Sequence, residues 1–402
     1  MSLNSQQYAA LAQDSYNPRR QGEEVQLDGV RYNVLRHVDR PSGYQGTIYQ
    51  RADTGEIVVA HRGTEFDRQP VRDGLTDAGM VTSRANVQAN DAIALTREAM
   101  QIARASGTSP EVTVTGHSLG GTLAQVSAHH FDLRGETFNA YGAVSLNRRI
   151  PEGGDRMVNH VMAGDPVSAA SQHYGQVRVY ANQQEIDTLR DKGYENNRSG
   201  WDLRNPLTAA GSLMGSHSMH NFTNVDGNGR PDRSVLTDPQ AQQRAQDFDP
   251  MIDKYRGDVM AARRGLTGAL RSPLGTVEDA IDGIRGPLPA GEPARREERE
   301  RQRHSSLDAP ETLPRLQPAM GLRASADDPS SMVDRMLAAA QSGDRDAFRQ
   351  ATQAAAANDP GRNLRQEAVA TVDRQEQQAL AQQAQKPQVE QPDAPSRGPR
   401  MA

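Results

Sequence analysis

One stretch of the sequence has a residue pattern that is typical of a nucleophilic serine. Residues 116–120 read Gly-His-Ser-Leu-Gly, which has the spacing Gly-x-Ser-x-Gly. A β-branched, strand-like stretch precedes this pattern, and a helix-like stretch at 122–131 follows it. In so tight a turn between strand and helix, a side chain at either glycine position would collide with neighbouring backbone. The pattern therefore predicts that Ser118 stands above a sheet edge as a nucleophile.

A nucleophilic serine needs a base, and it needs an acid that orients the base. For a serine in this kind of turn the expected chain order is serine, acid, histidine. Asp165 follows the strand-like residues 158–162, so its carboxylate is expected at the same sheet edge as Ser118. We therefore predict Asp165 as the acid, with Asp155 as the nearest substitute.

The base is expected in the segment 216–222, which contains two histidines. His217 is the preferred base, and His220 is the alternative. His173 is a further alternative, although it precedes a predicted strand and would need a different loop path. His117 belongs to the serine turn itself and is expected to be structural.

The oxyanion that forms during acyl transfer needs two hydrogen-bond donors. The backbone N–H of Leu119, at the start of the predicted helix, is the first donor. The second is expected from the turn 61–65, which follows a buried, strand-like stretch at 56–60. In this turn Gly63 permits close approach to a substrate, and Thr64 offers both an N–H and a hydroxyl group.

The sequence predicts neither a metal nor a cofactor. The chain has no cysteine, which excludes disulfides, thiolate metal ligands and a cysteine nucleophile. Its histidine and acidic residues do not have the spacing of a metal-binding motif. Residues 226–229 resemble the start of a calcium loop, but Arg230 stands where a third ligand is needed.

The composition also excludes several classes of partner and location. A formal net charge of −5 over 402 residues gives no basic footprint for a nucleic acid. No run approaches the roughly 18 consecutive apolar residues of a membrane span. The first residues have no basic start followed by an apolar run, so we expect synthesis in the cytoplasm without a secretory signal peptide.

Strand-like and helix-like segments alternate through the first part of the chain. Residues 25–34 are expected to form one strand, and residues 92–105 are expected to form a helix. Such alternation is typical of an α/β fold, in which helices flank a sheet. The elements that carry Ser118 and Asp165 therefore belong to one sheet.

The aromatic residues indicate where the folded domain ends. Sixteen of the 17 aromatic side chains lie at or before Tyr255, and large aromatic side chains dominate core energetics. We predict a main domain over residues 1–240. Residues 241–330 are polar and charged and are predicted to form a helical linker. Residues 331–402 are predicted to be a small helical, Gln-rich and partly disordered region.

The motifs described above, taken in order, resemble those of the class 3 lipase family of α/β-hydrolases. The resemblance covers roughly residues 1–225. It rests on five stretches, VVAHRGT at 58–64, VTVTGHSLGGTLA at 112–124, FNAYG at 138–142, VNHVMAGDPV at 158–167 and HSMHNF at 217–222.

The resemblance implies an α/β-hydrolase fold and a role for each of the predicted site residues. It implies Ser118 as nucleophile, Asp165 as acid and His217 as base, with Thr64 and Leu119 as the oxyanion hole. It also implies a mobile lid after the oxyanion loop, within residues 67–89.

The same resemblance implies hydrolysis of lipid acyl esters at a membrane surface. Together with the effector-like C-terminal region described next, it implies phospholipase A1-like cleavage of membrane glycerophospholipids. A thioesterase or short-chain carboxylesterase with the same site residues is one alternative, and a catalytically idle binding scaffold is another. Residues 331–402 are similar to the Gln-rich C-terminal regions of bacterial effectors exported by type IV secretion. That similarity implies an antibacterial effector made in a bacterial cytoplasm and delivered into a target cell, with a secretion coupling protein and a cognate immunity protein as partners.

Overall fold

The structure is a computed structural model that describes residues 3–63, 76–108, 110–195, 204–225, 230–270 and 285–307. One compact unit spans Met1–Ala309, and a second unit, Pro310–Ala402, lies outside the described residues. The predicted Gln-rich region therefore also lies outside them. The described elements in chain order are α1 (Ser5–Asp14), β1 (Glu24–Leu27), β2 (Val30–Asp39), β3 (Gln45–Arg51), β4 (Ile57–His61), α2 (Thr76–Ala105), β5 (Val112–His117), α3 (Leu119–Phe131), β6 (Arg134–Phe138), η2 (Ala143–Ser145), β7 (Gly153–Met162), α4 (Pro166–Ala169), β8 (Tyr174–Tyr180), α5 (Gln183–Asp191), α6 (Pro206–Ser212), η3 (Met214–His217), η4 (Met219–Phe222), η5 (Val235–Thr237), α7 (Pro239–Asp247), α8 (Asp249–Leu270) and α10 (Glu292–Leu307).

In the described residues, eight strands form one mixed sheet whose spatial order is the chain order from β1 to β8. The strands from β1 to β4 pair antiparallel, and those from β4 to β8 pair parallel. Every parallel connection steps in the same direction across the sheet. Because such connections are right-handed, their helices are placed on the same face of the sheet.

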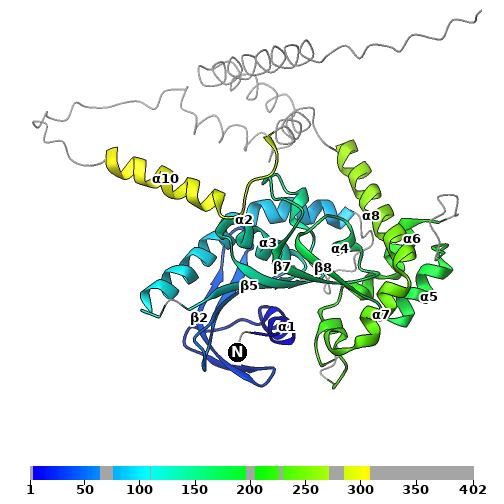
Figure 1. The fold of residues 1–402 in the computed structure, drawn as a ribbon, viewed down its shortest axis with the longest axis horizontal. Helices are drawn as coiled ribbons and strands as arrows, with labels where there is room; N and C mark the ends of the chain where they lie inside the picture. The colour runs from blue at the N-terminus through cyan, green and yellow to red at the C-terminus, as the bar shows by residue number, and fades with distance from the viewer. Residues whose placement is uncertain are drawn as a thin grey trace, which may run out of the picture. The chain divides into compact units, whose positions relative to one another are not determined.

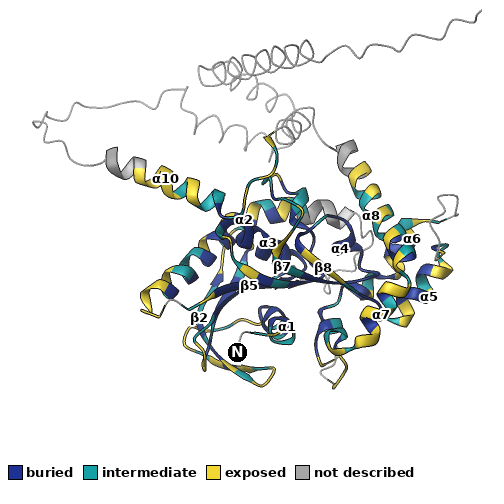
Figure 2. Ribbon diagram, viewed as in Figure 1, coloured by how far each residue is buried: buried dark blue, intermediate teal, exposed yellow. Residues whose placement is uncertain are grey.

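The two faces of the sheet are covered by different parts of the chain. The larger apolar cluster joins the sheet to α2, α3, α4 and α8, and the smaller one joins it to α1, η4 and α7. Figure 1 shows α1 on one side of the sheet and α2, α3 and α4 on the other. Every residue of β4 and β5 is buried (Figure 2), as expected for strands covered on both faces. The predicted sheet flanked by helices is therefore confirmed.

The strand predicted at residues 25–34 is in fact a hairpin. Leu27 pairs with Val30, so the turn contains two residues, Asp28 and Gly29. Their φ angles are 46° and 74°, and a two-residue turn with both φ angles positive matches the twist of the flanking strands. Asp-Gly is the dipeptide that this turn favours, so the break was readable from the sequence.

The helix predicted at residues 92–105 is longer than expected, because α2 begins at Thr76. Of the lid predicted at 67–89, residues 67–75 lie outside the described residues. The remaining part belongs to α2, where Ala85 and Ala89 are buried in the larger apolar cluster. No helix in the described ranges combines the length and the apolar character that crossing a bilayer requires.

The packed core continues past residue 240, where the sequence predicts a linker. Met251, Ile252, Tyr255 and Val259 of α8 are all buried in the larger apolar cluster. Their spacing of one, three and four residues places them on one face of the helix. The segment after residue 240 therefore contributes a helix to the core of the first compact unit.

Buried histidines make the stability of the fold depend on pH. Desolvation lowers the pKa of His61 and His117 from 6.5 to about 3, and that of His173 to about 4. In the unfolded chain these rings become charged as the pH falls below 6.5, while in the folded chain they stay neutral. The free energy of unfolding is therefore expected to fall between pH 6.5 and about pH 4, by at most about 1.4 kcal/mol per pH unit for each ring.

Urea unfolding followed by circular dichroism at pH 7, 6 and 5 measures this dependence. Burial raises the pKa of Glu185 and Asp28, which acts in the opposite direction, and it lowers the pKa of His37, His129 and His130, which acts in the same direction. The variant His61→Asn is expected to flatten the pH dependence, and the partly buried His220→Asn serves as its control. Stability that stays level from pH 7 to pH 5 in the wild-type protein would contradict this prediction.

Candidate active site

Ser118 lies at the turn between β5 and α3, which is where the Gly-x-Ser-x-Gly pattern places it. Its φ of 55° and ψ of −127° are strained for an L-residue, and strain of this kind concentrates at functional turns. A Cβ atom on Gly120 would lie 2.0 Å from the carbonyl oxygen of His61, and one on Gly116 would lie 2.4 Å from the carbonyl carbon of Gly120. Backbone packing therefore requires glycine on both sides of the serine.

Three side chains from separate segments meet at this turn. His217 Nε2 lies 2.9 Å from Ser118 Oγ, and His217 Nδ1 lies 3.0 Å from Asp165 Oδ1. All three residues are buried. A neutral ring that donates its Nδ1–H to the carboxylate presents Nε2 as the acceptor for the serine hydroxyl. The geometry is that of a serine, a base and an orienting acid.

The turn that follows β7 holds Asp165 in place. The carboxylate caps the N-terminus of α4, where it accepts hydrogen bonds from the backbone N–H groups of Val167 at 3.0 Å and Ser168 at 3.1 Å. Burial alone raises the pKa of Asp165, but the interactions with His217 and these N–H donors outweigh it, and the net direction is downward. Asp165 is therefore held as a carboxylate facing the ring of His217.

The alternatives that the sequence left open have other surroundings. His220 lies in η4, where its backbone N–H donates to Ser218 Oγ. His173 Nε2 lies 2.8 Å from the carbonyl oxygen of Ala140. Asp155 is an exposed residue near the start of β7. The structure thus joins His217 by hydrogen bonds to both Ser118 and Asp165, and the contacts of His220 and His173 described above are with other groups.

Of the two predicted oxyanion donors, the structure describes one. Leu119 is the first residue of α3, so its N–H is among those that have no acceptor within the helix. Thr64 lies outside the described residues, and its role stays a prediction. The residue before it, Gly63, does lie beside the serine, because a Cβ atom there would be 3.3 Å from Ser118 Cβ. The loop that carries Thr64 therefore starts at the site.

Sequence reasoning missed a contact behind the base. The Tyr16 hydroxyl lies 2.8 Å from His117 Nδ1, and His117 Nε2 lies 2.8 Å from the carbonyl oxygen of His217. The rings of His117 and His217 have centroids 4.9 Å apart. A neutral His117 donates from Nε2 to the carbonyl and accepts at Nδ1 from the tyrosine. Nothing in the spacing of Tyr16 links it to a residue 101 positions later in the sequence.

Removal of the tyrosine hydroxyl tests this contact. Tyr16→Phe removes the hydrogen bond that His117 Nδ1 accepts, and His117 in turn holds the backbone of His217. We expect this loss to raise the activation free energy by about 1 kcal/mol, so the rate of ester hydrolysis is expected to fall about fivefold. Tyr32→Phe is the matched control, because the buried Tyr32 hydroxyl has no hydrogen-bond partner among the residues that the structure describes. Equal rates for Tyr16→Phe and the wild-type protein, measured with a chromogenic ester, would show that the contact has no effect on catalysis.

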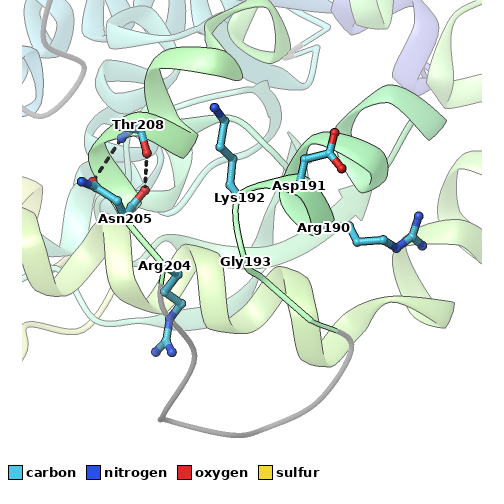
Figure 3. Close-up of a pocket in the computed structure, with 7 residues that line it drawn as sticks. All are labelled: Arg190, Asp191, Lys192, Gly193, Arg204, Asn205 and Thr208. Atoms are coloured by element: carbon cyan, nitrogen blue, oxygen red, sulfur yellow. Dashed lines mark hydrogen bonds between the residues drawn. The ribbon is translucent and has the colours of Figure 1, made fainter.

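A pocket of about 460 Å³ lies between the end of α5 and the start of α6 (Figure 3). None of its described lining residues is Ser118, Asp165 or His217. Its two arginines are engaged by carboxylates, Arg190 by Asp187 and Arg204 by Asp258. This pocket is therefore separate from the three side chains that meet at Ser118. Among the described residues, no cluster of three or more His, Asp or Glu side chains is placed to hold a metal ion.

Several solved lipase structures resemble this chain. The Rhizomucor miehei lipase–propeptide complex is 14% identical, with a TM-score of 0.31 over 45% of this chain and 68% of that chain. Lip2 lipase from Yarrowia lipolytica is 14% identical, with a TM-score of 0.31 over 44% and 77%. A triacylglycerol lipase from Penicillium expansum is 17% identical, with a TM-score of 0.30 over 44% and 77%. Among curated protein sequences, none matches the chain.

A comparison with protein-family models finds a match that covers half of the chain. The matching model is Phospholipase-like, described as a Tle-like phospholipase domain, and it matches residues 7–209. The matched range includes Ser118 and Asp165 and ends before His217. From the extent of this match, the protein belongs to the Tle-like phospholipase domain family.

Proposed function

We propose that the protein is a serine hydrolase that cleaves the acyl ester bonds of membrane glycerophospholipids in a phospholipase A1-like reaction. The observation that carries this proposal is the hydrogen-bonded series Ser118–His217–Asp165 at a strained strand–helix turn. The family match supports a lipid ester as the substrate. In our proposal Ser118 is the nucleophile, His217 the base and Asp165 the acid.

The proposed reaction proceeds through an acyl-enzyme. His217 Nε2 takes the proton of Ser118 Oγ as Oγ attacks the carbonyl carbon of the ester. The negative charge that develops on the carbonyl oxygen is stabilised by the N–H of Leu119 and by Thr64. His217 then protonates the departing lysolipid oxygen, which breaks the ester bond. A water molecule, deprotonated by His217, attacks the acyl-enzyme and releases the fatty acid and Ser118.

Fatty-acid release from phosphatidylglycerol and phosphatidylethanolamine vesicles tests the proposal. Release is expected from the wild-type protein and is expected to be absent with Ser118→Ala. Ser127→Ala is the matched control, because Ser127 is a buried serine of α3 whose hydroxyl meets no hydrogen-bond partner within the described part of the chain. The lysolipid product identifies the acyl position that is cleaved.

Two outcomes would contradict this proposal. Full release by Ser118→Ala would remove Ser118 from the mechanism. An absence of release by the wild-type protein, together with labelling of Ser118 by a fluorophosphonate, would favour a thioesterase or a short-chain carboxylesterase. An absence of both release and labelling would favour a binding scaffold.

We also propose that the protein acts as an antibacterial effector and that residues 331–402 direct its export into a target cell. The support is the Gln-rich composition of this region, which is similar to that of the C-terminal regions of exported bacterial effectors. Deletion of residues 331–402 is expected to abolish export and to leave vesicle hydrolysis unchanged. Export that persists after this deletion would overturn the proposal. Protection of the producing cell by a cognate immunity protein would be visible as inhibition of the purified enzyme.

A further inference from the structure

The turn at residues 162–168, which carries Asp165, accepts hydrogen bonds from α8, a helix that lies outside the residues matched by the family model. Tyr255 of α8 donates from its hydroxyl to the carbonyl oxygen of Gly164 at 3.0 Å. Arg256, the next residue of α8, donates to the carbonyl oxygens of Met162 at 3.3 Å and Ser168 at 3.1 Å. These three carbonyls lie on both sides of Asp165. Two adjacent side chains of α8 therefore bind backbone carbonyls that precede and follow Asp165 in the chain.

Arg256 is also connected to the carboxylate itself through one residue. Its guanidinium donates to Ser168 Oγ at 3.3 Å, and the backbone N–H of Ser168 donates to Asp165 Oδ2 at 3.1 Å. The other carboxylate oxygen faces His217. A continuous series of contacts thus runs from Arg256 through Ser168, Asp165 and His217 to Ser118.

We propose that Tyr255 and Arg256 are positioning residues for the reaction, and that the charge of Arg256 sets how strongly Asp165 stabilises the charged form of His217. The inference rests on the proposed function, because it assigns these residues to the same site. It extends the catalytic unit to α8, beyond the residues 7–209 that the family model matches.

The charges around Asp165 determine how Arg256 acts on it. Desolvation lowers the pKa of Arg256, and the carboxylate of Asp165 is the largest influence that raises it. An arginine keeps its charge in a protein, so its positive charge offsets part of the negative charge of Asp165. The other titratable groups around Asp165, His217 and Arg256 are Glu185, His117, His173, His220, Asp253 and Tyr255.

A cation and a carboxylate from other elements contact the turn at residues 162–168, which carries Asp165. Arg256 of α8 is the cation, and Glu185 of α5 is the carboxylate. Glu185 Oε1 accepts the backbone N–H of Gly164 at 2.9 Å. Burial raises the pKa of Glu185. Without the charge of Arg256, the environment of His217 becomes more negative, which favours the protonated ring. The base is then lost to protonation at a higher pH than in the wild-type protein.

The test compares Arg256→Met, which removes the charge, with Arg256→Lys, which keeps the charge and loses the planar fork of donors. In Arg256→Met we expect kcat to fall about tenfold with KM unchanged, and the acid limb of the pH–rate profile to move up by about 0.5–1 unit. In Arg256→Lys the acid limb is expected to stay in place while kcat falls. Tyr255→Phe is expected to lower kcat about fivefold without moving the acid limb.

Arg263→Met is the matched control on the same helix. Its guanidinium donates to the carbonyl oxygen of Ala170, at the end of α4 away from Asp165, at 3.0 Å. A structural role of α8 alone predicts that Arg263→Met and Arg256→Met have the same effect, and that neither moves the acid limb. That result would overturn the inference. If Arg256→Met does not fold, unchanged kcat in both Arg256→Lys and Tyr255→Phe would overturn it.

A readout that needs no turnover separates this inference from the proposed function. The titration of the His217 ring is followed by NMR, with its signal identified by its loss in His217→Asn. Its midpoint is expected to be higher in Arg256→Met than in the wild-type protein or in Arg263→Met. An unmoved midpoint rejects the inference even if the wild-type protein hydrolyses vesicles. A raised midpoint in a protein that hydrolyses no ester rejects the proposed function and retains the coupling of Arg256 to His217.

Discussion

Ser118→Ala and His217→Ala are each expected to lower kcat for ester hydrolysis by about a millionfold, and the double variant is expected to lose no more than either single one. The reason is that Ser118 Oγ and His217 Nε2 are 2.9 Å apart and act as one proton-transfer unit. Once either group is absent, the other has no reaction to assist. Single-turnover rates with a chromogenic ester and with phospholipid vesicles measure the three variants.

His220→Ala is the control for this prediction, because it removes the second histidine of the same segment. Its kcat is expected to stay within about twofold of the wild-type value, since a half-buried side chain away from the reacting atoms contributes little to a rate. Strong loss in His220→Ala together with retained activity in His217→Ala would reverse the assignment of the base. Multiplicative losses in the double variant would show that Ser118 and His217 act independently.

Asp165→Asn is expected to lower kcat by about ten-thousandfold while the fold is retained. The asparagine side chain can still accept a backbone N–H at the start of α4 through its single oxygen. Its amide group donates toward His217 Nδ1, however, which favours the ring tautomer whose Nε2 carries the hydrogen. That nitrogen can then no longer accept the proton of Ser118, so the base is disabled although every residue remains in place.

Asp238→Asn provides a matched control for this substitution. Asp238 caps α7 and accepts the backbone N–H of Gln240, so the same change is made at a helix start that lies outside the site. Circular dichroism and urea unfolding are expected to be similar for the two variants, with activity lost only in Asp165→Asn. A loss of activity in Asp165→Asn that follows a loss of folded protein would assign the carboxylate a structural role.

The sequence was sufficient where a local pattern has a local physical cause. Gly116 and Gly120 are needed because a side chain at either position would meet backbone, so the serine turn is visible in five consecutive residues. Asp165 is visible because it follows a strand-like stretch, which the structure describes as the end of β7. Neighbours along the chain decide these features, so the order of the residues alone is enough to predict them.

The sequence was not sufficient where a contact joins distant segments. Tyr16 meets His117, and Arg256 meets Ser168, across 101 and 88 positions respectively. No spacing rule links such residues, because their proximity depends on how complete helices pack on the sheet. The sequence of α8 contains apolar residues at helical spacing, among them Met251, Ile252 and Tyr255. The average composition of the segment after residue 240 is nevertheless polar, because polar residues lie between them, and this average led to the prediction of a linker.

The agreement between strand order and chain order has a consequence for how the protein is made. As the ribosome releases the chain, each new strand can pair with the edge left by the strand before it. Ser118 emerges first, followed by Asp165, then His217, and last by Arg256. A nascent chain from which Ser118 has emerged still lacks His217, the proposed base, and α8, whose side chains contact the turn that carries Asp165. The proposed catalytic site is therefore complete only after translation has passed α8.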